Sequence, residues 1–350
     1  MERRYAAGSL QHFAAHALRW AGARGEDANL VAEGLTAADL RGVHSHGVVR
    51  TRIYVLRLKH GSINANGSLR VVHDAGPLVL ADAGDGLGIA MAARAMDMAI
   101  QRAQLHGVGV VGVRNSSHCG MLAWPTMRAV RMKMIGIAMS NADAKVAPWG
   151  ARTKYLGTNP IAIAIPTAHE PPIILDMATS FVAHGRIVAA ATRGETIPAG
   201  WAVDGDGRMT TDPHQALQGA LLPFGGAKGS GLALIIDVLA GLWTGALSGP
   251  MITPLYQQLD RAQGLGHLFV AFSVEAFTDL EGFTERVDRF IRDIRSLPPA
   301  EGHTRVYLPG EIEHLRTIEY QERGIPLPPD VVAEIQRVAG EIGIAAPVGS

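Results

Sequence analysis

Helical and strand-like segments alternate between residues 88 and 139, and this alternation constrains the fold more than any other feature of the chain. Gly88–His106 is a long run rich in Ala and Met that predicts a helix, and Met121–Arg131 predicts a second one. Val108–Val113 and Ile135–Met139 are short apolar runs that predict buried strands. A mixed order of helices and strands is typical of an α/β or α+β sheet with helical flanks.

Helices are also expected at both ends of the chain. After Ser9, a candidate cap, apolar residues from Leu10 to Ala21 follow the 3.6-residue helical period. Further helices are predicted from Asp27 to about Leu40, from Arg50 to about Gly61, over Phe181–Ala191, Gly231–Trp243 and Gly282–Ile294, and from Pro329 onward. Further strands are predicted near Leu69–Val72, Leu78–Ala81, Ile161–Ile165, Ile173–Leu175 and His267–Phe272.

The composition excludes several classes of protein. The 350 residues, 47% of them hydrophobic, are ample for a core and suggest about two domains. Lys+Arg and Asp+Glu are both 32, so no basic excess points to nucleic acid and no charged tail points to a membrane. The single cysteine, Cys119, fits a reducing compartment, and apolar runs such as Gly231–Leu242 are too short to span a bilayer. A cytoplasmic protein is therefore expected, since Met1–Tyr5 also lacks the apolar core of a signal peptide.

The stretch from Arg41 to Arg50 concentrates chemistry that suits catalysis. His44 and His46 can exchange a proton near neutral pH, and Ser45 adds a hydroxyl group. The guanidinium of Arg50 matches a carboxylate. A proton donor next to a carboxylate clamp is what the reduction of a small 2-oxo or 2-imino acid requires. The alternative is an ordinary solvated loop between two helices.

Two glycine-rich motifs give opposite indications about phosphate binding. Gly107–Gly112 matches the letters GxGxxG, but it lies inside a strand-like run instead of opening a helix, so we reject it as a dinucleotide loop. Leu222–Gly231 places Lys228 among glycines directly before a predicted helix, which suits a phosphate cradle. A lysine on a solvated loop is the alternative there. His12 and His16 lack a third ligand, and no metal site is predicted.

Seven motifs in order carry a resemblance that covers nearly the whole chain. They are Ser45-His46-Gly47, Arg114-Asn115-Ser116-Ser117-His118, Pro148-Trp149-Gly150, Gly157-Thr158-Asn159-Pro160, Asp176-Met177-Ala178-Thr179-Ser180, Lys228-Gly229-Ser230 and Leu308-Pro309-Gly310-Glu311. With them the chain resembles the type-2 malate/L-lactate dehydrogenases. The resemblance implies a mixed α/β fold with a non-Rossmann NAD(P)-binding sheet domain, expected over residues 119–302. A helical substrate domain is expected over residues 1–118 and 303–350, in a homodimer whose active site lies near the subunit interface.

The resemblance also implies roles for single residues. His46 matches the family's proton donor, with Ser45 beside it, and Arg50 matches the arginine that binds the substrate carboxylate. Thr158 and His44 are expected at the substrate, and His118 either as an acid/base or beside the nicotinamide. The expected cofactor-binding residues are His118, Cys119, Gly120, Met121, Leu122, Asp176, Met177, Ala178, Ala227, Lys228, Arg305, Leu308, Pro309, Gly310 and Glu311.

The substrate stays open between two kinds of small carboxylic acid. Several motifs, among them the segment around His184, resemble the reductases of cyclic imino acids such as Δ1-piperideine-2-carboxylate. Arg186 stands where those reductases carry an aspartate, and this difference favours a 2-oxo/2-hydroxy acid. An N-alkyl or cyclic imino acid is the alternative, and a binding protein of the same fold without catalysis is a third reading. The sequence leaves the choice between NAD and NADP open.

Overall fold

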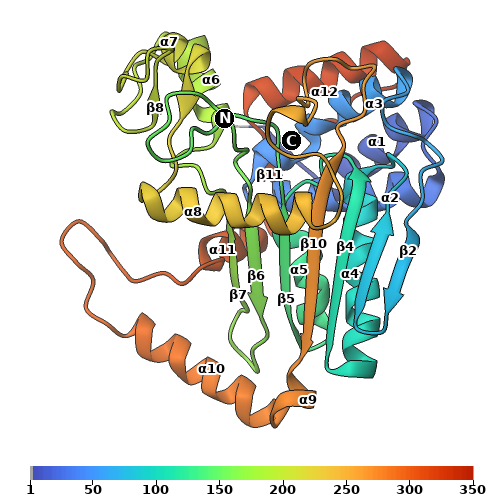
Figure 1. Ribbon diagram of the computed structural model, residues 1–350, viewed down its shortest axis with the longest axis vertical. Helices are drawn as coiled ribbons and strands as arrows, with labels where there is room; N and C mark the ends of the chain where they lie inside the picture. The colour runs from blue at the N-terminus through green and yellow to red at the C-terminus, as the bar shows by residue number, and fades with distance from the viewer. Residues whose placement is uncertain (1–2, 350) are drawn as a thin grey trace.

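A seven-stranded sheet forms the centre of the computed structural model, which describes residues 3–349. Its strand order is β2-β3-β4-β10-β5-β6-β7, and β3 and β4 are its parallel pair (Figure 1). The strands are β2 (Arg70–Ala75), β3 (Leu78–Asp82), β4 (Val108–Ser116), β5 (Met134–Ser140), β6 (Ile161–Ile165), β7 (Ile173–Met177) and β10 (Leu265–Ser273). Two small sheets pair β1 (Arg4–Tyr5) with β11 (Ile325–Pro326) and β8 (Ala202–Val203) with β9 (Ala220–Leu221).

Helices cover both faces of this sheet. The longer ones are α1 (Ala7–Trp20), α2 (Gly25–Leu40), α3 (Thr51–Lys59), α4 (Gly88–His106), α5 (Ala123–Arg131), α6 (His184–Arg193), α8 (Ala227–Ile236), α10 (Leu280–Arg295), α11 (Glu311–Arg323) and α12 (Pro329–Ile342). The shorter ones are α7 (Pro213–Gln218), α9 (Val274–Phe277) and four turns: η1 (His44–His46), η2 (Val48–Arg50), η3 (Asp237–Leu242) and η4 (Gly249–Met251). Helices α4 and α5 pack on one face, and α8 with its continuation η3 crosses the other (Figure 1).

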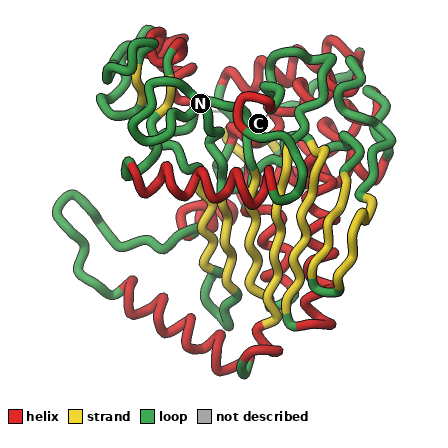
Figure 2. Tube along the Cα trace, viewed as in Figure 1, coloured by secondary structure: helices red, strands yellow, loops and turns green. Residues whose placement is uncertain are grey.

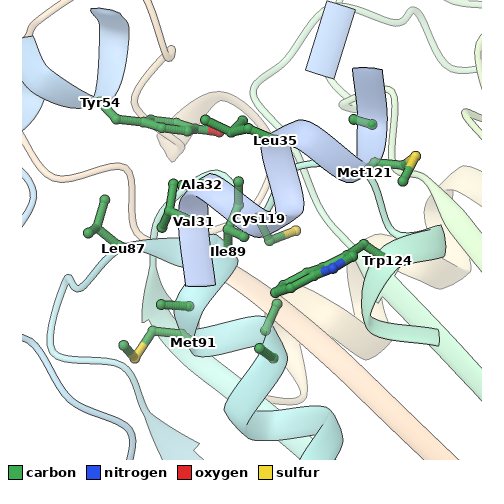
Figure 3. Close-up of a cluster of buried hydrophobic side chains, with 14 of the residues drawn as sticks. Val31, Ala32, Leu35, Tyr54, Leu87, Ile89, Met91, Cys119, Met121 and Trp124 are labelled. Carbon is green, nitrogen blue, oxygen red and sulfur yellow. The ribbon is translucent and has the colours of Figure 1, made fainter. Parts of the chain in front are cut away.

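The main core lies between the sheet and the N-terminal helices. Helix α4 buries Ala and Met side chains along most of its length, because it is enclosed by the sheet on one side and by α2 on the other. Figure 3 shows Leu35 of α2, Ile89 of α4 and Trp124 of α5 in one apolar cluster. Helices α1, α3 and α12 extend this core and hold the segment that contains η1 and η2.

The glycines of β4 allow helices to approach the sheet closely from both sides. A Cβ atom on Gly109 would lie 2.0 Å from the carbonyl oxygen of Ala99 in α4, and one on Gly112 would lie 3.1 Å from Thr244 on the other side. Gly107 ends α4 with a φ of 82°, and the rest of the GxGxxG letters lie inside β4, where Gly109 and Gly112 serve the packing of the sheet.

A smaller lobe with its own apolar core stands beside one end of the sheet. It contains α6, α7, β8 and β9, mostly joined by loops (Figure 2), and its core includes Val146, Ile187 and Leu221. Helix α10 and the loop that follows it extend away from the sheet (Figure 1). The carboxylate of Asp288 ties α10 to the backbone of the β6–β7 loop, where it accepts hydrogen bonds from the N–H groups of Ala168 and His169 at 3.2 and 2.9 Å.

Most predicted elements are present, with changes at their ends. The helix predicted from Gly231 begins at Ala227, β4 continues through a predicted loop to Ser116, and α11 was not predicted. The division at residue 118 stays a prediction, and the sheet includes β2, β3 and β4 from the N-terminal side of that division. Among residues 3–349, no helix is both long enough and apolar enough to cross a membrane.

Candidate active site

A cleft of about 2410 Å³ lies where the main body faces the small lobe. Its walls come from η1 and η2, the start of α5, the end of β7 and helix α6 of the lobe. Two loops complete it, residues 250–258 and residues 307–310. Ser45, His46, Arg50, His118, Thr158 and Asp176 all line this cleft, so the structure gathers segments that are far apart in the sequence.

Asp39 holds the turn that carries the histidines. This carboxylate, at the end of α2, is fully buried, and its Oδ1 is 2.9 Å from the Nδ1 of His44. Its Oδ2 accepts a hydrogen bond from the N–H of Val48 at 2.7 Å. Burial raises the pKa of Asp39, and the hydrogen bonds from His44 and Val48 counter that rise. His44 lines the cleft, but its Nδ1 is used by Asp39, and its contact with a substrate stays a prediction.

Gly47 is required by the same buried carboxylate. A Cβ atom at this position would lie 2.0 Å from the Oδ1 of Asp39, which no side chain can tolerate. Glycine therefore lets the chain pass over Asp39 between η1 and η2, and this places Ser45, His46 and Arg50 on the side of the cleft.

His46 and His118 face each other across the floor of the cleft. Their ring centroids are 5.6 Å apart and the planes are inclined by 22°. The hydroxyl oxygen of Ser45 is 3.0 Å from the Nδ1 of His46. Burial and the charge of Arg50 lower the pKa of His46 to about 3, and burial together with neighbouring groups holds the pKa of His118 well below its usual value. Both rings are therefore neutral near neutral pH.

Arg50 presents its guanidinium beside the two imidazoles. Its Nε donates to the carbonyl oxygen of Ser45 at 2.7 Å, and its Nη1 donates to the hydroxyl of Tyr256. The guanidinium carbon lies 5.4 Å from the centre of the Tyr256 ring. A carboxylate bound here would place the adjacent C2 atom of an acid next to the histidines.

Tyr54 and Arg57 were not predicted from the sequence; both are buried behind the cleft and contact residues that line it. The hydroxyl of Tyr54, in α3, is 2.7 Å from the Nδ1 of His118, and the backbone N–H of His118 donates to the Oε1 of Gln263 at 3.0 Å. Arg57, also in α3, is fully buried and donates to the carbonyl oxygens of Leu255 and Pro254 at 2.9 and 2.7 Å. Arg57 thereby fixes the loop that carries Tyr256.

The predicted cofactor segments line the adjoining part of the cleft. Asp176, at the end of β7, accepts a hydrogen bond from the N–H of Ala123 at 2.7 Å, and burial raises its pKa to about 6. The carbonyl oxygen of Thr158 accepts hydrogen bonds from the N–H and the hydroxyl of Thr179 at 2.8 and 2.9 Å. The other lining residues from these segments are Cys119, Gly120, Met121, Leu122, Met177, Ala178, Leu308, Pro309 and Gly310.

Arg41 gives an independent sign that this part of the cleft suits an anionic group. Its side chain is 7% exposed and lines the cleft, and its Nε is buried without a hydrogen-bond partner among the described residues. Its Nη1 has only the sulfur of Met127, at 3.8 Å. A buried cation with unused donors suits the phosphates of a dinucleotide, and Asp176 offers an acceptor for a ribose hydroxyl.

Four predicted cofactor residues lie outside the lining of this cleft. Ala227 and Lys228 are exposed in the first turn of α8, not in a loop before it. Arg305 forms an ion pair with Glu311, and the second oxygen of Glu311 accepts a hydrogen bond from the N–H of Leu308 at 3.1 Å. Through these two contacts Glu311 holds the loop of residues 307–310, which lines the cleft.

Comparison with known proteins gives one consistent result. The sequence profile of the family described as Malate/L-lactate dehydrogenase matches residues 5–336. The L-sulfolactate dehydrogenase of Methanocaldococcus jannaschii is 38% identical over 91% of each chain. The solved structure of the sulfolactate dehydrogenase from that organism covers 97% of this chain and 98% of its own, with a TM-score of 0.90 and 35% identity.

The names of other relatives state different substrates and, in two cases, different coenzymes. Ureidoglycolate dehydrogenase (NAD(+)) of Escherichia coli K12 is 36% identical over 89% of this chain and 88% of its own. (2R)-3-sulfolactate dehydrogenase (NADP(+)) of Chromohalobacter salexigens is 34% identical over 97% of this chain and 99% of its own. The structure of Δ1-piperideine-2-carboxylate reductase from Pseudomonas syringae covers 97% of this chain and 99% of its own, with a TM-score of 0.86 and 29% identity.

Proposed function

This chain belongs to the malate/L-lactate dehydrogenase family, and we propose that it is an NAD(P)-dependent oxidoreductase acting on a small 2-oxo or 2-hydroxy acid. In this reaction a hydride passes between the nicotinamide and C2 of the acid. One observation carries the proposal: a guanidinium, Arg50, lies beside two neutral imidazoles, His46 and His118, in the same cleft.

The residues of the cleft divide the chemistry between them. The nicotinamide supplies the hydride when it is bound. Arg50 binds the carboxylate of the acid and, with the hydroxyl of Tyr256, fixes the position of C2. His46 exchanges the proton with the oxygen at C2. Because Arg50 is one cause of the low pKa of His46, a carboxylate on Arg50 raises the proton affinity of His46.

The cofactor segments have separate tasks in this proposal. Gly120, Met121 and Leu122 offer backbone at the start of α5, where a helix N-terminus favours negative charge. Asp176 accepts from a ribose hydroxyl, and the charge of Arg41 counters part of the rise that burial causes in the pKa of this carboxyl. Relatives named for NAD(+) and for NADP(+) both support a nicotinamide coenzyme and leave either one open.

The proposal favours 2-oxo acids over imino acids as substrates. Arg186 lines the cleft in α6, and a cation there opposes the positive charge that the nitrogen of a protonated imine carries. The structural likeness to a Δ1-piperideine-2-carboxylate reductase keeps the cyclic imino acids as the alternative substrates.

A reductase screen with NADH and with NADPH tests the proposed activity. The substrates are pyruvate, oxaloacetate, sulfopyruvate, Δ1-piperideine-2-carboxylate, and pyruvate with methylamine. We expect turnover of at least one of the first three acids, and turnover of the last two alone would show an imine reductase. If neither coenzyme binds, as judged from its fluorescence, the non-catalytic reading holds instead.

His46→Ala tests the proton transfer, with the exposed His60→Ala as the matched control. We expect kcat to fall by about 10²–10⁴, the usual contribution of general acid–base catalysis, while coenzyme binding stays close to that of the wild type. Wild-type kcat in His46→Ala would transfer the role to His118.

We also propose that the chain forms a homodimer through α8 and η3. Leu234, Ile235, Val238, Leu242 and Trp243 are between 37% and 60% exposed on this segment, which runs across the outside of the sheet (Figure 1). A continuous apolar strip of this kind needs a cover. A second copy is the cover that the family resemblance implies, and Lys228 would then meet a cofactor at the subunit interface.

Light scattering after size exclusion tests the dimer. We expect the wild type to have the mass of two chains and Ile235→Glu/Leu242→Glu to have the mass of one. Phe277→Glu is the control, because Phe277 is 94% exposed on α9, outside the strip. A wild type with the mass of one chain would reject the dimer.

A further inference from the structure

Tyr54 is a buried tyrosine whose hydroxyl meets the ring of His118, and the mechanism above does not use it. It is 2% exposed in α3, and its hydroxyl oxygen is 2.7 Å from the Nδ1 of His118. A second group reaches the same nitrogen, because the backbone N–H of Gly120 points at it from 3.3 Å.

The Gly120 contact decides which ring nitrogen of His118 carries the proton. A backbone N–H can only donate, so the Nδ1 that it meets must offer a lone pair. The hydroxyl of Tyr54 must then donate to that nitrogen as well. Burial keeps the pKa of Tyr54 far above its usual value, so the donor proton stays on the hydroxyl.

We propose that Tyr54 and the backbone of Gly120 together fix the tautomer of His118, with Nδ1 unprotonated and the ring proton on Nε2. Tyr54 is then a positioning residue, because it acts through His118 and not on the substrate. Among residues 3–349, no hydrogen bond occupies Nε2, while His118 lines the cleft. The Nε2–H group is therefore left as a donor for the substrate.

Burial and four basic neighbours, of which Arg50 and Lys145 are charged near neutral pH, keep His118 in this neutral form. Arg50 and His46 lie beside it on η2 and η1, and Lys145 and His267 act on it from other segments of the structure. Burial is the largest cause of its low pKa, and all four neighbours act in the same direction. The two contacts at Nδ1, and not the low pKa, distinguish His118 from His46, because they leave the Nε2–H of His118 as a hydrogen-bond donor.

The two histidines consequently have different tasks, an inference that rests on the proposed function. His118 donates from Nε2 to the oxygen at C2 and polarises it, while His46 exchanges the proton. The tautomer itself does not depend on the reaction, so it can be tested without substrate or coenzyme.

The test is a long-range ¹⁵N–¹H correlation spectrum of the full chain labelled with ¹⁵N-histidine. Loss of signals in His118→Gln assigns the ring. We expect the wild type to show a protonated Nε2 and an unprotonated Nδ1 for His118. A proton on Nδ1 in the wild type overturns the proposal, whether or not any variant folds.

Tyr54→Phe removes only the hydroxyl group and tests how much that group contributes to the tautomer preference of His118. Losing one donor should shift the tautomer equilibrium toward the Nδ1–H form by about three- to tenfold, as expected for one hydrogen bond. We expect kcat to fall by a similar factor. KM for the acid should change little, because Arg50 binds the carboxylate and is not altered. Ring-nitrogen signals in Tyr54→Phe that match the wild type would overturn the assignment to Tyr54.

Tyr5→Phe is the matched control, because Tyr5 is also buried and lies on β1. Tyr5→Phe should leave the ring-nitrogen signals of His118 and kcat unchanged, even where it lowers the melting temperature. If no acid is reduced by the wild type, the proposed function fails, and the spectrum still decides the tautomer.

Discussion

Asp39 illustrates how, at the scale of single residues, the reactive side chains depend on groups that never reach the cleft. Its carboxylate spans the two turns that carry His46 and Arg50, through its contacts with His44 and Val48. The sequence shows the reactive groups because they crowd into one short stretch. It does not show that the preceding helix ends in a buried acid beneath them.

Gly47→Ala should disrupt this arrangement. The new Cβ would fall 2.0 Å from the Oδ1 of Asp39, so the carboxylate must move and lose its hydrogen bonds. We expect a loss of about 1.5–3 kcal/mol in the free energy of unfolding, the scale for hydrogen bonds to a charged group, and a lower kcat/KM. Urea denaturation and steady-state kinetics measure the two effects.

Gly8→Ala provides the control for this substitution. A Cβ on Gly8, in the first turn of α1, has no atom within 4 Å. If Gly47→Ala were as stable and as active as Gly8→Ala, Asp39 would not constrain the turn.

Much of the candidate site could be predicted because its motifs are local. Ser45, His46 and Arg50 are neighbours in sequence, and His118 lies in a recognisable motif. Tyr54 could not be predicted, because its partner is 64 residues away and it looks like one more apolar position of α3. The contact of Arg50 with Tyr256 spans 206 residues and is equally invisible to local patterns.

Single elements follow from the sequence when their apolar pattern is long and regular. Helix α4 and strand β6 have the predicted bounds, since each is buried along most of its length. Helix α11 was missed although Ile312, Leu315 and Ile318 recur at three-residue intervals, because most residues around them are charged or polar. These three side chains stay 41–44% exposed, and Glu311 is the one buried residue of the helix. Helix α8 begins earlier than predicted because its first turn, from Ala227, is rich in glycine and resembles a loop.

Gly109→Ala tests the interpretation of the GxGxxG letters at this scale. The added Cβ would meet the backbone carbonyl of Ala99, so β4 and α4 must move apart. Overpacking of this kind costs about 1–3 kcal/mol, and we expect a lower melting temperature.

The dissociation constant of NAD(P)H should change little in the folded Gly109→Ala protein. A phosphate loop would give the opposite result, a large loss of coenzyme binding at nearly unchanged stability. Gly8→Ala is again the control, because a Cβ on Gly8 meets no atom within 4 Å.

At the scale of the whole molecule, local sequence patterns do not predict the order of the strands in the sheet. Strand β10 comes from residues 265–273 and inserts between β4 and β5, pairing antiparallel with both. Only contacts distant in sequence specify such an insertion. The same holds for the small lobe, whose core joins Val146 to Leu221 across the chain.

Buried histidines give the whole molecule a defined response to acid. Burial lowers the pKa of His267 and of His184 to about 4, and that of His46 to about 3. Unfolded histidines titrate near a pKa of roughly 6.5, so below that pH the unfolded chain binds more protons than the native chain. Stability is therefore complete above pH 6.5 and is lost as the pH falls toward 4. Asp176, with a pKa of about 6, opposes this loss below pH 6, because its native carboxyl binds a proton before the unfolded one does.

We therefore expect the free energy of unfolding to fall with increasing slope as the pH is lowered from 7 toward 5, and Asp176 reduces this slope below about pH 6. Each histidine with a lowered pKa contributes about 0.7 kcal/mol per pH unit at pH 6.5 and approaches about 1.4 kcal/mol per pH unit near pH 5. His267→Gln removes one such group from the interior of β10 and should reduce the slope by about that amount, whereas the exposed His303→Gln should not. Urea titrations at a fixed protein concentration between pH 5 and pH 8 measure the slope. A wild type whose stability is flat or rises as the pH is lowered from 7 to 6 would show that these rings are not neutral in the native state.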